Sequence, residues 1–277
     1  MSRWVAGLAG LAVVVAGAAV AGPAAAADPP AQDWTDTFDE ATLDPRWDIT
    51  SEVASAWSLA SNPGALTLTS QPGDTYQTVN SAKNIFMVDI PDGDFTAVTT
   101  VHAPVSKVYQ GAGLIAWSDM DNYVRAGLTF VGDLSPSGRA IETDVESGGT
   151  FSAVDFEDRA ASQEETLRLQ RAGDTLTTSY WDGTDWVVAS STTLSFDITA
   201  VGLYALAAQD GTTHQAVFDS FGVTASDGAD QVPTGPFTLH ADGTPDAGAG
   251  SGRDGGGRRG FPHAAHARRR TAGRGRG

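Results

Sequence analysis

The sequence predicts an all-β fold in which two antiparallel sheets form a sandwich or a jelly roll. Short alternating or β-branched runs recur between residues 33 and 223, as is typical of strands. Clusters of Gly, Asp, Asn and Pro punctuate these runs, with the roughly 8–12-residue spacing of an all-β sandwich. The same region contains no segment with the apolar spacing of an amphipathic helix.

The first five predicted strands follow from alternation and β-branched content. Residues 65–70 (ALTLTS) alternate Leu with Thr, and residues 95–103 (FTAVTTVHA) are rich in Thr and Val. Residues 111–118 (GAGLIAWS) and 122–131 (NYVRAGLTFV) flank an Asp-rich turn signal. Residues 139–147 (RAIETDVES) alternate Ile, Thr and Val with carboxylates, so the two kinds of residue lie on opposite faces of a strand.

The remaining predicted strands continue the same pattern. Residues 165–172 (ETLRLQRA) carry Leu at alternate positions. Residues 174–181 (DTLTTSYW) and 185–191 (DWVVASS) are separated by an Asp-Gly turn signal, which predicts a hairpin. Residues 201–208 (VGLYALAA) and 214–223 (HQAVFDSFGV) complete the series.

The two ends of the chain differ in composition from this region. Residues 1–27 have one Arg, an apolar run and a small-residue end, which predicts a signal peptide and a secreted, extracellular protein. The sandwich is expected over residues 28–224. Residues 225–277 are rich in Gly, Arg and Ala and are expected to be a disordered linker and tail. A gene shifted out of frame after about residue 240 would explain the same change in composition.

Composition narrows the range of partners. The chain of 277 residues has a formal net charge of −17, although eight of its arginines lie in residues 253–277. Nucleic acids and anionic membranes would be repelled by so acidic a domain. Cations or neutral polysaccharides are compatible with it. The chain contains no Cys, which excludes disulfides and a lipoprotein anchor.

Several segments together resemble one known family, in the expected order. They are 93–95 (GDF), 110–114 (QGAGL), 119–124 (DMDNYV), 167–171 (LRLQR) and 218–223 (FDSFGV). The sequence is similar to the concanavalin A-like domain found at the C-terminus of β-xylosidases. The resemblance implies a two-sheet concanavalin A-like jelly roll that acts as a non-catalytic binding or accessory module. It also implies a glycosidase domain, outside this chain, as a partner.

Three carboxylates share one face of the strand 139–147. Glu142, Asp144 and Glu146 resemble the E-x-D-x-E signature of laminarinase-type glycoside hydrolases. That resemblance implies a retaining endo-β-glucanase with Glu142 as nucleophile and Glu146 as acid/base. Asp144, between them, would tune the ionisation of Glu142. The other sequence features of those enzymes are missing. The favoured interpretation is the solvated face of an ordinary strand, with no catalytic residue.

Candidate carbohydrate-binding residues are aromatic or can hydrogen-bond to hydroxyl groups. Sugars stack their apolar faces on aromatic rings, while charged and amide side chains bind their hydroxyl groups. Most aromatic residues in a sandwich are part of its core, which leaves this assignment open. The candidates are Trp117, Tyr123, Arg125, Glu142, Trp181 and Trp186.

A structural Ca²⁺ is implied by the resemblance, because such sandwiches often hold one between their first and last strands. The acidic residues in the corresponding segments are Asp39, with Glu40 beside it, and Asp219. Carboxylate and carbonyl oxygens are the ligands that calcium prefers. The alternative is that Asp219 only hydrogen-bonds to an adjoining strand.

Three functions are therefore compatible with the sequence. The favoured one is a secreted, non-catalytic module that binds a polysaccharide or oligosaccharide. The second is the retaining endo-β-glucanase. The third is a structural or adhesive domain of a truncated multidomain protein.

Overall fold

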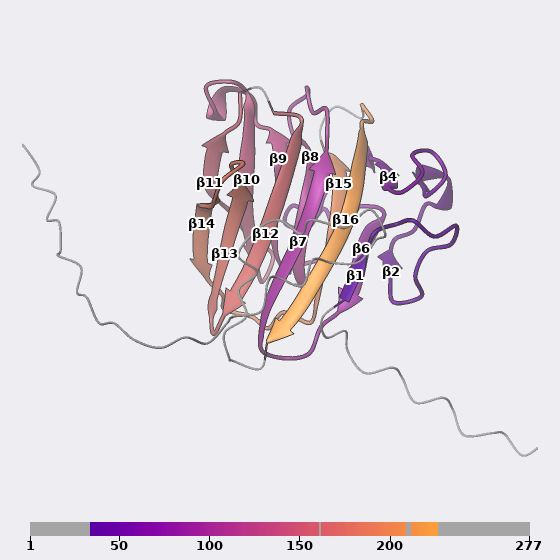
Figure 1. Ribbon diagram of the computed structural model, residues 1–277. Helices are drawn as coiled ribbons and strands as arrows, with labels where there is room; N and C mark the ends of the chain where they lie inside the picture. The colour runs from indigo at the N-terminus through magenta and orange to yellow at the C-terminus, as the bar shows by residue number, and fades with distance from the viewer. Residues whose placement is uncertain (1–33, 161, 209–211, 227–277) are drawn as a thin grey trace, which may run out of the picture. The chain divides into compact units, whose positions relative to one another are not determined.

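Two sheets make up the computed structural model, which describes residues 34–160, 162–208 and 212–226. Figure 1 shows them as two layers, with sheet A nearer the viewer and sheet B behind it. In spatial order, sheet A contains β14 (Trp186–Thr193), β13 (Thr175–Trp181), β12 (Glu164–Ala172), β7 (Asp94–His102), β16 (Gln215–Ser226), β4 (Leu66–Thr69) and β3 (Trp57–Ser58), and β1 (Trp34–Asp36) also pairs with β16.

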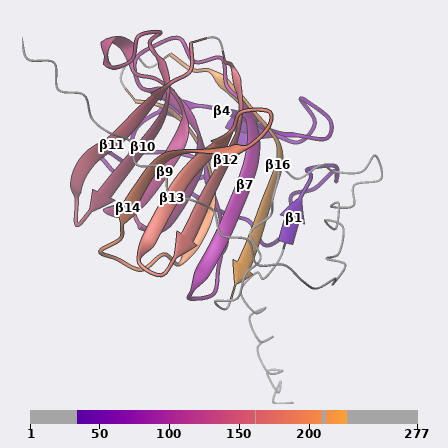
Figure 2. The same ribbon diagram turned by 60° about the vertical axis from the view of Figure 1, so that its left-hand side comes forward.

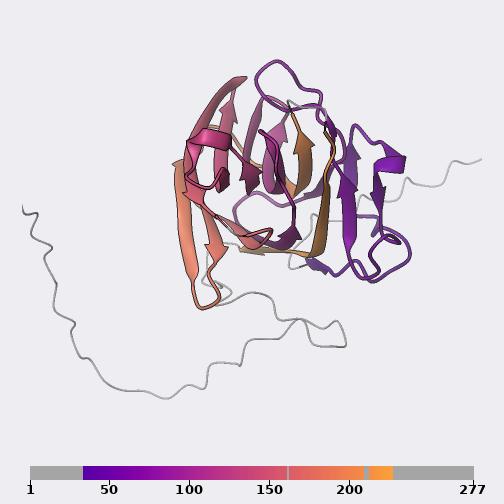
Figure 3. The same cartoon turned by 90° about the horizontal axis from the view of Figure 1, so that it is seen from above.

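Sheet B is antiparallel except for one short parallel pairing. In spatial order it contains β11 (Thr150–Asp158), β10 (Arg139–Ser147), β9 (Asn122–Phe130), β8 (Gln110–Asp119), β15 (Ala200–Ala207), β6 (Ile85–Asp89) and β2 (Asp48–Thr50), and β5 (Gln71–Pro72) runs parallel to β15. The turned views in Figures 2 and 3 show these strands stacked against those of sheet A.

The main core lies between the two sheets. Alternate residues of each strand face it, such as Phe95 and Val101 of β7, which are fully buried. Near β1 the core is aromatic: the ring of Trp47 lies 5.0 Å from that of Phe221 and 5.9 Å from that of Phe86. Burying each large apolar side chain contributes about 1.5–3 kcal/mol. In a chain without Cys, this packing holds the sheets together.

The predicted fold class is confirmed, and each of the ten predicted strands has its counterpart. The described residues contain no α-helix, only 3-10 turns at Ala54–Ala56 and Gly132–Leu134. None of their helical segments is long and apolar enough to cross a membrane. The predicted signal peptide (1–27) and nearly all of the predicted tail (225–277) lie outside the described residues, so both stay predictions.

A smaller apolar cluster lies on the other face of sheet B, away from the core. Ile115 of β8 and Tyr123 of β9 pack there with Met87 of β6 and with Ala82. Ala82 belongs to the segment between β5 and β6, residues 73–84, which we call the 73–84 loop. This loop therefore covers part of the outer face of sheet B, and the covered part adjoins the candidate site.

Candidate functional site

Glycines hollow the outer face of sheet B. Gly113 of β8 lies opposite both Gly127 of β9 and Tyr204 of β15. A Cβ atom on Gly127 would lie 2.3 Å from the hydroxyl of Tyr204 and 2.5 Å from the carbonyl oxygen of Ala112. Glycine within a strand often marks such a close approach. The phenol of Tyr204 therefore lies across the sheet in space that any larger residue would fill.

The three carboxylates of β10 project onto this outer face, as their alternation predicts, but they are not solvated. Glu142 is 8% exposed, Asp144 is 1% exposed and Glu146 is 0% exposed. The predicted solvated face is therefore wrong. Its physical cause is the covering of sheet B by the 73–84 loop, which is distant in sequence and binds Glu146 through Gln77 and Arg125 through Asp74.

Arg125 forms the centre of the buried charge cluster. It lies opposite Asp144 in the pairing of β9 with β10. Its Nε donates to Asp144 Oδ1 at 3.0 Å and its Nη2 donates to Asp144 Oδ2 at 2.7 Å. Its Nη1 donates to Asp74 Oδ1 of the 73–84 loop, also at 3.0 Å. The two-pronged contact with Asp144 is the strong form of an arginine–carboxylate pair, and the contact of Nη1 with Asp74 ties the loop to the sheet.

Glu146 is held by the same loop. Its Oε2 accepts hydrogen bonds from the backbone N–H of Gln77 at 2.7 Å and from the hydroxyl of Tyr123 at 3.1 Å. A further contact joins Asn80 Nδ2 to Asp121 Oδ1 at 2.8 Å. The loop therefore closes the end of the sheet over Glu146, and no polysaccharide chain can lie along the whole row of carboxylates.

A cavity of about 330 Å³ remains above Glu142. Its wall is aromatic and its floor is polar, a combination typical of sites for small ligands. Tyr109, in the wall, has φ of 59°, which is unusual for a residue of its size. The aromatic lining is Tyr76, Tyr109, Phe151, Phe156 and Tyr204, and the polar and charged lining is Asp74, Arg125, Thr129 and Glu142.

The electrostatics of the floor favour a proton on Glu142. Burial, followed by the nearby carboxylates of Asp144 and Asp74, raises the pKa of Glu142 to about 7 against the opposing effect of Arg125. Arg125 is within ion-pair distance of Asp144 and Asp74. Within the described part of the chain, Glu142 has no such cationic partner.

The proposed catalytic pair gains no support from this geometry. A retaining glycosidase needs two carboxyl groups about 5–5.5 Å apart that both reach the substrate. Glu142 lines the cavity, but Glu146 does not, and Glu146 is sealed by Gln77 and Tyr123. Asp144 is occupied by Arg125. One free carboxyl group is compatible with binding and does not supply the two-carboxylate mechanism.

Of the six predicted carbohydrate-binding residues, the structure brings Arg125 and Glu142 to the cavity. Tyr123 is fully buried, and Trp117 stacks on it with ring centroids 6.3 Å apart. Trp181 and Trp186 pair across β13 and β14 in sheet A. They point away from the core, because their neighbours Tyr180 and Val187 pack into it.

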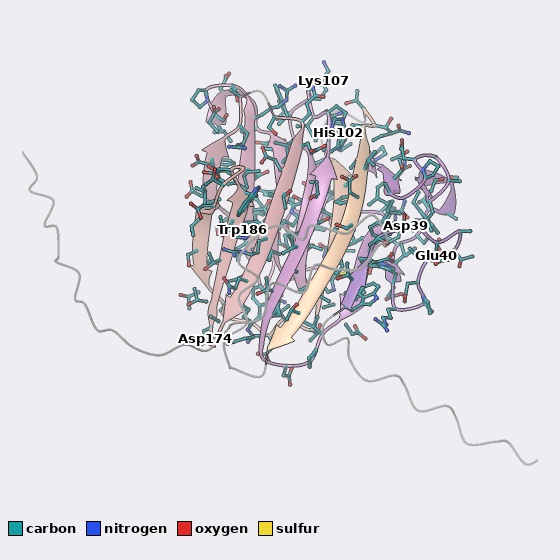
Figure 4. The ribbon with its side chains drawn as sticks, in the orientation of Figure 1. Asp39, Glu40, His102, Lys107, Asp174 and Trp186 are labelled. Carbon is teal, nitrogen blue, oxygen red and sulfur yellow. The ribbon has the colours of Figure 1, made fainter. Side chains whose placement is uncertain are left out.

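Trp186 is labelled on sheet A in Figure 4, in the layer opposite the one that bears the cavity. The guanidinium of Arg168 lies 4.4 Å from the centre of its ring. These tryptophans therefore belong to a different surface from the cavity over Glu142.

The predicted calcium ligands have separate surroundings. Asp39 accepts a hydrogen bond from Thr37 Oγ1 at 2.8 Å. Burial and Glu164 raise the pKa of Asp219, and nearby His102 opposes this. Figure 4 shows His102 toward the upper end of sheet A, with Asp39 and Glu40 to its right. Across the described residues, no three Asp, Glu or His side chains gather in a way that could hold a metal. Calcium binding stays a prediction.

The fold and the cavity define a concanavalin A-like β-sandwich with a hollow on the outer face of one sheet. The chain belongs to the family of β-xylosidase C-terminal concanavalin A-like domains, whose model matches residues 35–224. No match was found among curated proteins.

Solved structures show the same fold. A GH43 protein from Bacillus licheniformis matches with a TM-score of 0.62 and 23% identity, over 69% of this chain and 39% of its own. The xyloglucan PUL GH43B protein of Bacteroides ovatus matches with a TM-score of 0.58 and 21% identity, over 72% and 42%. A xylan β-1,4-xylosidase from Bacillus halodurans C-125 matches with a TM-score of 0.57 and 18% identity, over 69% and 38%. The chain thus spans about two fifths of each of these proteins.

Sequence reasoning missed most of the cavity. Asp74, Tyr76, Tyr109, Phe151 and Phe156 were not predicted as site residues. They lie in loops and in β11, so no strand periodicity links them. One available signal was the glycine spacing in the segments QGAGL and RAGL, because glycines at alternate strand positions leave room on one face.

Proposed function

We propose that this chain is a secreted, non-catalytic module that binds a single sugar unit of a polysaccharide or oligosaccharide in the cavity over Glu142. The observation that carries the proposal is the cavity of about 330 Å³, with aromatic walls and hydrogen-bonding groups on its floor. Its volume is at the lower end of the range for ligand pockets, which suits one ring better than an extended chain.

The rigidity of the floor supports binding. Arg125 is fixed by Asp144 and Asp74, and the hydroxyl of Tyr204 lies over Gly127. Groups that are already held in place lose little conformational freedom when a ligand arrives. The left-handed backbone of Tyr109 is further support, because local strain tends to occur at functional sites.

The accessory role is supported by the family. Its name places this kind of domain at the C-terminus of β-xylosidases, and the similar GH43 structures are more than twice as long as the matched region. A glycosidase domain is therefore the partner we propose, with the sandwich presenting or retaining the sugar. The acidic charge of the chain favours a neutral or cationic glycan over an anionic one.

A glycan array probed with the purified domain tests the proposal, followed by calorimetry on each glycan that binds. Tyr109→Ala is expected to weaken binding by tenfold or more by removing a stacking wall. Trp181→Ala, on the opposite sheet, is the matched control and is expected to bind like the parent. Equal loss in both variants, or no binding to any glycan, would refute the cavity as the site.

Catalysis is tested separately by the release of reducing sugar from laminarin and lichenan. For a non-catalytic module we expect no release of reducing sugar. Release that disappears in Glu142→Gln would establish the endo-β-glucanase instead. If the domain neither binds nor hydrolyses a glycan, the structural or adhesive function remains.

A further inference from the structure

The charges around the cavity do not balance. Asp74, Asp144 and Glu142 contribute three carboxyl groups, against the single guanidinium of Arg125. Both ion pairs of Arg125 go to the two aspartates. A ligand in the cavity therefore meets a surplus of negative charge, not a free cation.

Of these three carboxyl groups, Glu142 is the one without a counter-ion. It is 92% buried, since its exposed fraction is 8%, and it lines the cavity directly. Burying a carboxylate without a cation is costly, and the cost falls when a cation is placed beside it. The described residues place no Lys, Arg or His within ion-pair distance of Glu142, so the open cavity is where a cation from outside can reach it.

The walls suit a cation as well. Tyr76, Tyr109, Phe151, Phe156 and Tyr204 face the same space, and aromatic faces attract ammonium groups. A neutral sugar would use these walls but leave Glu142 without a counter-ion. An anionic sugar would be repelled by Glu142 and would find Arg125 already occupied.

We propose that the cavity selects a sugar ring that carries a protonated amine, with the ammonium group paired to Glu142 and the ring against the aromatic wall. This inference rests on the proposed function, since it assumes that the cavity binds a sugar. It adds the chemical class of the ligand, an amino sugar without an acetyl group on its nitrogen.

The amine and the carboxyl group must both be charged, so the preference depends on pH. The groups that face Glu142 are Asp144 of β10, Arg125 and Thr129 of β9, Tyr204 of β15 and Asp74 of the 73–84 loop. Burial and the two aspartates raise the pKa of Glu142 to about 7. The amine preference should therefore be largest near pH 7.5 and decline toward pH 5.5, where Glu142 is protonated.

The experiment compares the methyl β-glycosides of glucosamine, N-acetylglucosamine, glucose and glucuronic acid by calorimetry at pH 7.5 and 5.5. The expected result is about tenfold tighter binding of the glucosamine glycoside than of the glucose glycoside at pH 7.5. Glu142→Gln keeps the shape of the side chain and should abolish this preference. Asp133→Asn removes an exposed carboxylate next to Leu134 in the cavity wall and should leave the preference intact.

The outcomes separate the two proposals. Equal binding of the glucose and glucosamine glycosides overturns the amine inference and leaves the proposed function standing. An amine preference that falls equally in Glu142→Gln and Asp133→Asn reflects the acidity of the whole domain and overturns the assignment to Glu142. Binding only of other glycans also overturns the inference. Absence of binding by every glycan overturns both.

Discussion

Arg125 and Asp144 face each other across β9 and β10 and form a bidentate ion pair, with N–O distances of 3.0 and 2.7 Å, beneath the 73–84 loop. The pair converts what would be a row of acidic side chains on β10 into a partly neutralised floor. It also gives the loop an attachment point, because the remaining Nη1 of Arg125 is bound to Asp74.

Removing one member of this pair should cost more than removing both. Arg125→Leu leaves Asp144 buried without a cation, and we expect a loss of about 3–5 kcal/mol in the free energy of unfolding. The double variant Arg125→Leu/Asp144→Leu should be less destabilised than this single variant. Urea denaturation measures both. Arg171→Leu, which removes an exposed hydrogen bond to Gly173, is the control. A double variant with a lower free energy of unfolding than Arg125→Leu would contradict the expectation.

Glu142→Gln should stabilise the domain at high pH. The pKa of Glu142 is raised from 4.5 to about 7 in the folded state, so folding favours its protonated form. The resulting stability is present below about pH 4.5 and is lost as the pH rises through 7. At pH 8 the variant should exceed the parent by roughly 2–3 kcal/mol, and at pH 4 the two should be equal. Urea titrations at both pH values check this, and a pH-independent difference would refute it.

Gly127→Ala should destabilise the domain and disturb the cavity. The new Cβ would meet the hydroxyl of Tyr204 and the backbone of Ala112 at 2.3 and 2.5 Å, and overpacking of this kind typically costs about 1–3 kcal/mol. Gly173→Asn is the control. Gly173 has φ of +58° with nothing within 4 Å of an added Cβ, and Asn tolerates that backbone. Thermal denaturation compares the two variants. Similar decreases in melting temperature would show that the close contacts around Gly127 are not the cause of the loss.

Calcium should raise the melting temperature if the predicted ion is present. A ligand that binds only the folded state stabilises it by about 2.7 kcal/mol at one hundred times its dissociation constant. The measurement is thermal unfolding of protein treated with EDTA, before and after addition of CaCl₂ or MgCl₂. Asp219→Asn should remove the calcium response. Identical melting temperatures in all conditions would show that Asp39 and Asp219 hold no ion.

Secretion should remove the first 27 residues. The small-residue stretch that ends at Ala27 predicts a mature chain that begins at Asp28. Mass spectrometry of protein recovered from the culture medium checks this prediction. Protein found only inside the cell, with residues 1–27 intact, would contradict it.

Most of the predicted strands alternate or are rich in β-branched residues, although β15 was predicted with every one of its residues buried. β10 alternates cleanly because one face meets the core and the other carries the carboxylates. β6 (Ile85–Asp89) was missed: it has only five residues, and because four of them are buried it shows no alternation. β11 was missed as well, and a register shift opposite Thr143 and Asp144 interrupts its pairing.

The site was harder to predict than the fold, for a physical reason. Alternation correctly assigned Glu142, Asp144 and Glu146 to one face of a strand. It carried no information about what covers that face, because the covering residues Asp74 and Gln77 are about 70 positions away in the chain. Local patterns report which way a side chain points, whereas its solvation depends on distant segments.

The pairing of β1 with β16 has a consequence for the chain ends. Trp34 lies opposite Val223 and Asp36 lies opposite Phe221 in an antiparallel register, so the first and last strands form a β-hairpin whose connecting turn is absent. A short loop between residues 226 and 34 would supply that turn. New ends could then be opened at the exposed turn around Gly183, between β13 and β14, since exposed turns tolerate such cuts. The domain is thus a natural candidate for circular permutation, with its cavity on the other sheet left uncut.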